Sequence, residues 1–125
     1  MDLSNLKIEN CVEQGAEMTV MMPDGINSMK DEKGKDVTIT LLGKDAAAYR
    51  NKERELGAKY VAQMTKGKTF KATDEDECSK LSVVTVGWSS KNFSEKAAFD
   101  LYMNHPFIRE QVREFVETRA NFYKG

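Results

Sequence analysis

The triplet Gly67-Lys68-Thr69 is the part of this sequence that comes closest to a motif with known chemistry. It matches the last three positions of a phosphate-binding loop, in which backbone N–H groups and a lysine hold phosphates. The first glycine of that motif would fall at Ala62, and the preceding residues continue a helical pattern where the motif requires a strand. The triplet therefore predicts the end of a helix and a loop, not a phosphate site.

One histidine and two cysteines are the other candidates for nucleophilic or metal chemistry. His105 precedes Pro106, which favours a turn between two helices, and nothing in the spacing brings Cys11 or Cys78 to it. The four acids at residues 74–77 lack the alternating ligands and the glycine of an EF-hand loop, and they suit the positive end of a helix dipole. We therefore predict a non-enzymatic protein with no metal and no cofactor.

The composition is typical of a globular protein. The 125 residues are 40% hydrophobic and 31% charged, with a formal net charge of −1, so we expect one domain spanning residues 1–125. No apolar run approaches the roughly 20 residues that span a bilayer, and the first residues lack the basic start and apolar block of a secretory signal. We expect a cytoplasmic protein without a membrane partner.

Positive charge is concentrated in residues 44–72, which contain eight bases and three acids. Within this segment Lys66, Lys68 and Lys71 surround one aromatic residue, Phe70. Such a segment can contact a phosphate backbone or an acidic protein, and it can also be a solvated loop. Because the whole chain is slightly acidic, a general nucleic-acid-binding function is not favoured.

Two stretches near the start of the chain have the composition of strands. Residues 36–42 alternate apolar side chains with threonines, which is the period of a half-buried strand. Residues 17–22 form the second candidate, and the polar stretch between the two, residues 23–35, holds the glycines and the proline of turns. We predict an N-terminal β-hairpin within residues 1–43, which must pack on helices or on another subunit.

About four short helices are expected in residues 44–125. The first begins after Asp45, whose carboxylate can cap it, and ends near Gly67. The second begins at Thr73 and is closed by Gly87, although the β-branched residues before that glycine could instead be extended.

The third helix is capped by Ser94, and Pro106 suits the first turn of the fourth, which is the clearest amphipathic helix of the chain. The predicted fold class is therefore α+β, mainly α, with an N-terminal β-hairpin followed by about four short helices.

Two helical stripes hold the residues that we expect to bind a partner. The helix after Asp45 and the helix after Pro106 each place apolar side chains along one face. Only some of these side chains can face a partner, because four short helices need most of them for their own core. The eight candidates are Tyr49, Leu56, Tyr60, Phe107, Ile108, Val112, Phe115 and Phe122.

The order of these elements carries a family resemblance that covers about residues 37–123. The matching parts are Ile39-Thr40-Leu41-Leu42-Gly43-Lys44-Asp45, Tyr49-Arg50, Gly87-Trp88, Phe93-Ser94, Leu101-Tyr102, Pro106-Phe107-Ile108-Arg109-Glu110-Gln111-Val112, Phe115-Val116 and Asn121-Phe122. In this order the chain resembles the small tail assembly chaperones of long-tailed bacteriophages, of the siphophage type.

The resemblance implies a protein that self-associates, binds the long helical tape measure protein, keeps it soluble and helps to recruit tail tube protein. Such chaperones work in the host cytoplasm and are absent from the mature virion, and many also exist in a longer frameshifted form. An alternative is a structural head–tail joining or tail completion protein of the virion. In either case we expect a homo-oligomer.

Overall fold

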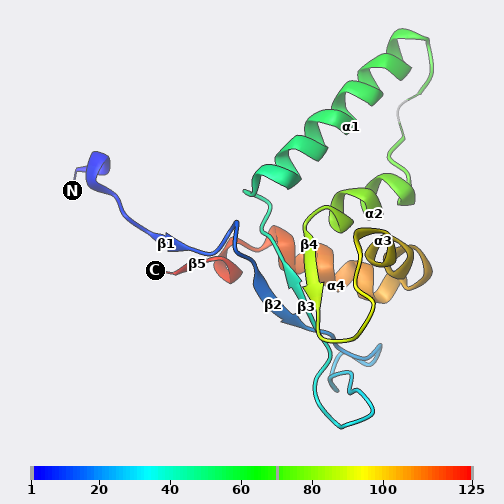
Figure 1. Ribbon diagram of the computed structural model, residues 1–125. Helices are drawn as coiled ribbons and strands as arrows, with labels where there is room; N and C mark the ends of the chain where they lie inside the picture. Colours follow the sequence, from blue (N-terminus) through cyan, green and yellow to red (C-terminus); the bar gives the residue numbers. More distant parts are fainter. Residues whose placement is uncertain (1, 70, 125) are drawn as a thin grey trace.

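The computed structural model describes residues 2–69 and 71–124, and it combines a small antiparallel sheet with four α-helices in that part of the chain (Figure 1). The sheet has the strand order β2-β3-β4, with β2 at Ala16–Thr19, β3 at Thr38–Leu41 and β4 at Thr85–Trp88. The short strands β1 (Glu9–Asn10) and β5 (Tyr123–Lys124) pair with each other instead.

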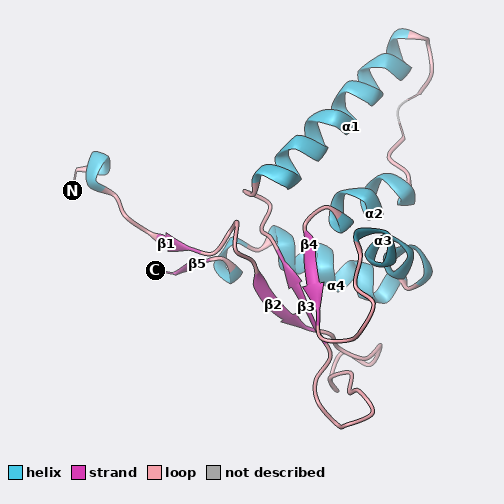
Figure 2. Cartoon of the chain, in the orientation of Figure 1, coloured by secondary structure: helices cyan, strands magenta, loops and turns pink. Residues whose placement is uncertain are grey.

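Helices make up the larger part of the secondary structure (Figure 2). They are α1 (Ala47–Thr65), α2 (Asp74–Ser82), α3 (Glu95–Asn104) and α4 (Pro106–Glu117), with 3-10 turns at Leu3–Asn5 and Arg119–Asn121. The predicted fold class, α+β and mainly α, is confirmed.

The predicted hairpin is the β2–β3 pair. Met18 lies opposite Ile39, and both side chains are buried because the alternation of each strand turns them toward the helices. Two details differ from the prediction. The first two strands of the chain, β1 and β2, belong to different sheets, and β4 joins the hairpin from the region that was expected to be helical.

The loop between β2 and β3 is more ordered than its polar sequence indicated. The Met29 N–H donates to the Val20 carbonyl (2.8 Å), and the Met29 carbonyl accepts from the Val37 N–H (2.9 Å). Beyond the end of β2, the Gln111 side chain of α4 accepts from the Met21 N–H (2.8 Å) and donates to the Met21 carbonyl (2.9 Å). The amide of Gln111 thus satisfies both backbone groups of Met21.

Helix α1 ends as predicted but begins differently. Gly67 follows its last turn with a φ of +76°, a conformation that glycine adopts without steric cost. The N-cap is Ala46, which makes no side-chain cap bond. The prediction that Asp45 caps this helix is therefore wrong: its carboxylate accepts from Arg119 (2.8 and 3.0 Å) and from the Tyr123 hydroxyl (2.8 Å).

Helix α2 begins at the predicted cap but ends early. The Thr73 hydroxyl accepts from the Asp76 N–H, and the Asp76 carboxylate accepts from the Thr73 N–H, which is a reciprocal capping box. The helix stops at Ser82, so the prediction that Gly87 closes it is wrong. Val83 and Val84 form a turn, and the extended alternative begins at Thr85, where β4 pairs with β3.

The first residues of α3 and α4 agree with the prediction, but α4 ends at Glu117, so Phe122, which was predicted to lie on its stripe, follows the 3-10 turn instead. The Ser94 hydroxyl accepts from the Ala97 N–H (2.9 Å), and α4 begins at Pro106, whose fixed φ and missing N–H suit a first turn. Inside the core, the Tyr102 hydroxyl of α3 lies 2.7 Å from the Thr85 hydroxyl of β4. Burial raises the pKa of Tyr102 to about 12.

The core lies between the sheet and the helices α2, α3 and α4. Its fully buried side chains include Val20, Ile39, Leu41, Leu81, Val84, Tyr102, Val112 and Val116. Helix α1 contributes only Tyr49 to it and extends away from the rest of the molecule (Figure 1). Tyr49 is therefore the one residue of this long helix that is buried, and the other α1 residues are partly or fully exposed.

The two ends of the chain meet beside the sheet. Strand β1 pairs with β5, the Cys11 N–H donates to the Phe122 carbonyl (2.8 Å), and the Phe122 ring lies against Gly43. The predicted boundary between a hairpin region (1–43) and a helical region (44–125) does not separate these contacts, because β4 and β5 both pair with strands from the first region.

Candidate partner-binding surfaces

Half of the eight predicted partner-binding residues belong to the protein's own core. The buried four are Tyr49, Ile108, Val112 and Phe122. Helix α4 buries its apolar stripe because it is packed against α2 and α3 and lies beside the sheet. The partly exposed four are Leu56, Tyr60, Phe107 and Phe115.

Tyr49 is held at the base of α1 by a charge contact. The Lys80 ammonium of α2 lies 5.1 Å from the centre of its ring, a cation–π arrangement. Burial raises the pKa of the Tyr49 phenol above its ordinary value. Tyr49 thus anchors the first turn of α1, and it offers little surface to a partner.

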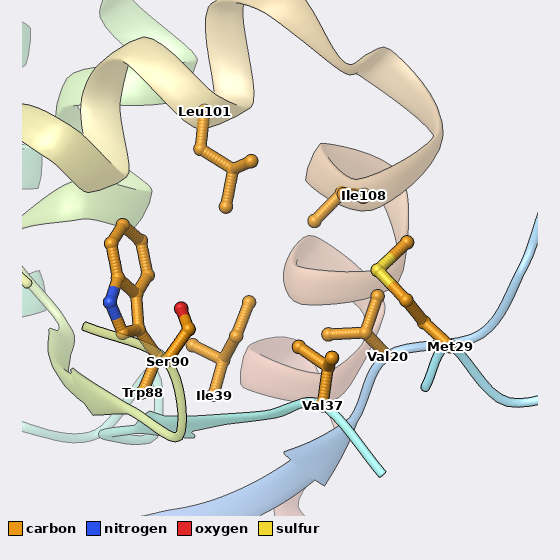
Figure 3. Close-up of a pocket in the computed structure, with 8 residues that line it drawn as sticks. All are labelled: Val20, Met29, Val37, Ile39, Trp88, Ser90, Leu101 and Ile108. Atoms are coloured by element: carbon orange, nitrogen blue, oxygen red, sulfur yellow. The ribbon is translucent and has the colours of Figure 1, made fainter. Parts of the chain in front are cut away.

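An apolar cavity opens between the sheet and helices α3 and α4 (Figure 3). We call it the Trp88 groove, and its volume is about 280 Å³. Its lining residues are Val20, Met29, Val37, Ile39, Trp88, Ser90, Leu101 and Ile108. Seven of these eight side chains are apolar, so the groove suits an apolar side chain from outside.

The wall of the Trp88 groove is fixed by local contacts. The Trp88 indole N–H donates to the Lys91 carbonyl (3.2 Å), and the Phe93 ring meets the indole edge-on with centroids 5.1 Å apart. Figure 3 shows the indole on one side of the groove and the Met29 thioether on the other. A rigid aromatic wall therefore faces a flexible one, which can adjust to different occupants.

The sequence prediction placed only Ile108 of the groove residues in its candidate set. The other lining residues come from the segment between β2 and β3, from β3, from β4 and the residues just after it, and from α3. Trp88 was visible in the sequence as part of the family resemblance, but no periodic pattern joins it to Met29 or Leu101. The β3–β4 pairing aligns Ile39 with Trp88, and the backbone bonds of Met29 to Val20 and Val37 place the loop beside them.

Leu56 and Tyr60 lie in a second, more polar cavity between α1 and α2. Its volume is about 270 Å³, and charged groups from α2 and α4 complete it: Asp76, Glu77, Lys80 and Arg113. Asp76 fastens α1 to α2, because it accepts from Lys59 (2.9 Å) and from the Tyr60 hydroxyl (3.2 Å). These bonds, that of Lys59 first, lower the pKa of Asp76.

Phe107 lies in a third cavity, between α4 and the loop after β2. We call it the Met22 cleft; its volume is about 280 Å³, and it is lined by Met21, Met22, Pro23, Gly25, Phe107, Glu110, Gln111 and Glu114. Phe115 borders a shallower hollow beside β2, with Met18 and Glu114 among its neighbours. The outer side of α4 therefore combines apolar and acidic groups.

The residues that the sequence offers as candidates for phosphate, nucleophilic or metal chemistry lie in separate parts of the structure. Gly67, Lys68 and Thr69 lie in the loop after α1, and His105 forms the junction between α3 and α4. Cys78 is buried beside Arg109, whose Nη1 is 3.4 Å from the sulfur, while burial raises the pKa of the thiol. Within the described part of the chain, no group of three or more His, Cys, Asp or Glu side chains is placed to hold a metal ion.

None of the helices within residues 2–69 and 71–124 is both long and apolar enough to cross a membrane. No protein-family model, no curated protein and no solved structure matches this chain.

Proposed function

We propose that this chain is a non-enzymatic tail assembly chaperone of a long-tailed bacteriophage. It self-associates, binds an apolar helical segment of the tape measure protein in the host cytoplasm, and helps to recruit tail tube protein. It leaves before the virion is complete. The family resemblance motivates this proposal, and the Trp88 groove is the observation that carries it.

The Trp88 groove suits such a client for a physical reason. A tape measure segment is a long helix with exposed apolar side chains, and a chaperone must cover them to keep the client soluble. Met29, Val37, Trp88 and Leu101 are only partly buried, so an apolar side chain can reach them. Burial of one large apolar side chain there contributes about 1.5–3 kcal/mol.

Co-expression with a tape measure protein tests the proposal. The native chain should raise the soluble fraction of the client, and Ser90→Trp should reduce this effect because the larger side chain fills the groove at its exposed polar edge. We expect the affinity for the client to fall about tenfold or more, the equivalent of losing one well-buried side chain. Soluble client is measured by centrifugation and gel densitometry.

Ser4→Trp is the matched control, because it makes the same change at an exposed position in the N-terminal 3-10 turn. It should leave client solubility unchanged. The proposal fails if the client is equally insoluble with and without the native chain. Mass spectrometry of purified particles separates the alternative, since a joining or completion protein would be found in the virion.

A further inference from the structure

The far end of α1 carries an exposed surface that is both apolar and basic. Val61 and Met64 are 59% and 55% exposed, and Lys66 and Lys68 follow them at the end of the helix. We call these four residues the α1 tip. Within residues 2–69 and 71–124, neither lysine takes part in an ion pair.

The Met22 cleft is apolar like the α1 tip, but its charged groups are acidic where those of the tip are basic. Met22 is 40% exposed and Phe107 is partly exposed, and the carboxylates of Glu110 and Glu114 stand on the exposed side of α4 beside them. Glu110 meets Arg113 only at 3.9 Å, and in the described part of the chain Glu114 has no ion-pair partner.

The sequence of α4 keeps these acids on the outside. Its arginines, Arg109 and Arg113, lie 3.9 Å from Asp74 and 3.7 Å from Glu77 of α2, respectively. The basic side of α4 is thus turned toward its own neighbour, and the acidic side is left for solvent or for another molecule. An apolar and basic helix end is the complement of such a surface.

One molecule cannot join these two surfaces to each other. Helix α1 extends to one end of the molecule, whereas the loop after β2, which forms part of the Met22 cleft, lies at the opposite end (Figure 1). We propose that the α1 tip of one copy docks in the Met22 cleft of a second copy. Met64 and Val61 contact Met22 and Phe107, while Lys66 and Lys68 pair with Glu110 and Glu114.

This inference rests on the self-association in the proposed function and specifies the two surfaces that carry it. It does not depend on client binding. It is heterologous, since different surfaces meet, so each added copy presents a new tip and a new cleft. Repetition gives a ring if the rotation closes and a helical filament if it does not. Because its charges are exposed, added salt weakens the association.

Charge reversal tests the interface on the full chain without any client. Lys66→Glu with Lys68→Glu, and separately Glu110→Lys with Glu114→Lys, should each weaken self-association on the order of tenfold or more, because like charges then face each other. The chain that carries all four changes should recover most of the native association. Sedimentation velocity at low and high salt measures these differences.

Mixing the two double variants gives a further test. Each double variant should associate weakly alone, but the intact cleft of the first accepts the intact tip of the second, so the mixture should form complexes more readily than either variant. Circular dichroism and thermal melting confirm that each variant is folded. The inference is overturned if the native chain stays monomeric at its highest soluble concentration, or if the four-change chain and the mixture fail to associate.

The client experiment and the self-association experiment test the two proposals independently. Ser90→Trp changes the Trp88 groove and should leave sedimentation unchanged, whereas the charge variants leave all eight groove residues in place. A native chain that self-associates but does not raise the solubility of the client counts against the proposed function alone. Loss of rescue by charge reversal counts against the tip-to-cleft interface alone.

Discussion

Asp45 shows how a residue's role depends on partners that are remote in sequence. Its carboxylate receives Arg119 and Tyr123, which lie 74 and 78 positions further along the chain. The hydrogen bonds from these two residues, those of Arg119 first, lower the pKa of Asp45 from 3.8 to about 2. The carboxylate therefore ties the beginning of α1 to the end of the chain.

Asp45→Asn should lower the free energy of unfolding by about 1–2 kcal/mol at neutral pH, after allowance for screening of the partly exposed pair. The folded pKa lies below the ordinary value of 3.8, so the stabilisation is fully present above about pH 4. It is lost as the pH falls through the folded value of about 2. Urea unfolding of both chains between pH 7 and pH 2 should show the difference shrinking.

The matched control is Asp100→Asn, which breaks the exposed pair of Asp100 with Lys96. Exposed pairs contribute little, so this change should cost less than about 0.5 kcal/mol at any pH. A pH-independent effect of Asp45→Asn would contradict the assignment of its stabilisation to charge.

Local capping was predictable, and this ion pair was not. Thr73 and Ser94 cap their helices through bonds to N–H groups three residues away, so the sequence itself places donor and acceptor together. Asp45 has the same cap-forming chemistry, but Arg119 competes for its carboxylate. Only the folded chain brings that competitor near, so a local pattern assigned the wrong partner.

At the level of elements, the attachment of α1 depends strongly on one buried side chain. Asp76 is 8% exposed and joins Lys59 and Tyr60 of α1 to the Thr73 cap of α2. Apart from Tyr49 at its base, α1 buries no other residue. The distal half of α1 is therefore held mainly by polar bonds.

Asp76→Asn should lower the free energy of unfolding by about 1.5–3 kcal/mol, because bonds to a charged acceptor are lost in a buried place. It should also speed hydrogen exchange in the second half of α1 more than in α3 or α4. Exchange measured by mass spectrometry checks both regions in one experiment.

Glu75→Gln provides the comparison, since this exposed acid lies in the same first turn of α2. It should change stability by less than about 0.5 kcal/mol and leave exchange in α1 unaltered. Equal exchange in α1 for both variants would show that Asp76 does not fasten it.

The helices and strands were predictable where the periodicity and the capping residues indicated the same boundaries. They were less predictable where pairing with a distant segment determined the structure. By propensity, Val86 fits either the end of a helix or a strand, and it lies in β4 because that segment pairs with the backbone of β3. The Trp88 groove was not predictable for a related reason, because it exists only where the segment between β2 and β3 converges with β3, β4, α3 and α4.

The closure of the whole molecule rests on a glycine that meets an aromatic ring. A Cβ at Gly43 would lie 3.0 Å from atoms of the Phe122 ring, and that ring is buried and packs edge-on against Phe115. The C-terminal segment packs against Gly43 in this way, and the pairing of β5 with β1 adds backbone contacts.

Gly43→Ala should destabilise the protein by about 1–3 kcal/mol, because the buried ring has to shift. Gly57→Ala is the control with the opposite sign: its Cβ would meet open space within α1, so it should stabilise by up to about 1 kcal/mol. Thermal melting of both variants checks the prediction, and equal shifts would contradict it.

The Gln111 amide affects how this protein behaves when many molecules are present. A free strand edge can recruit strands from other chains and so start cross-β aggregates. Gln111 satisfies both backbone groups of Met21 just beyond β2. A strand from another chain that paired along this edge would therefore find the N–H and the carbonyl of Met21 already hydrogen-bonded. If the chain self-associates as proposed, Gln111 protects it at this position from disordered strand-to-strand association.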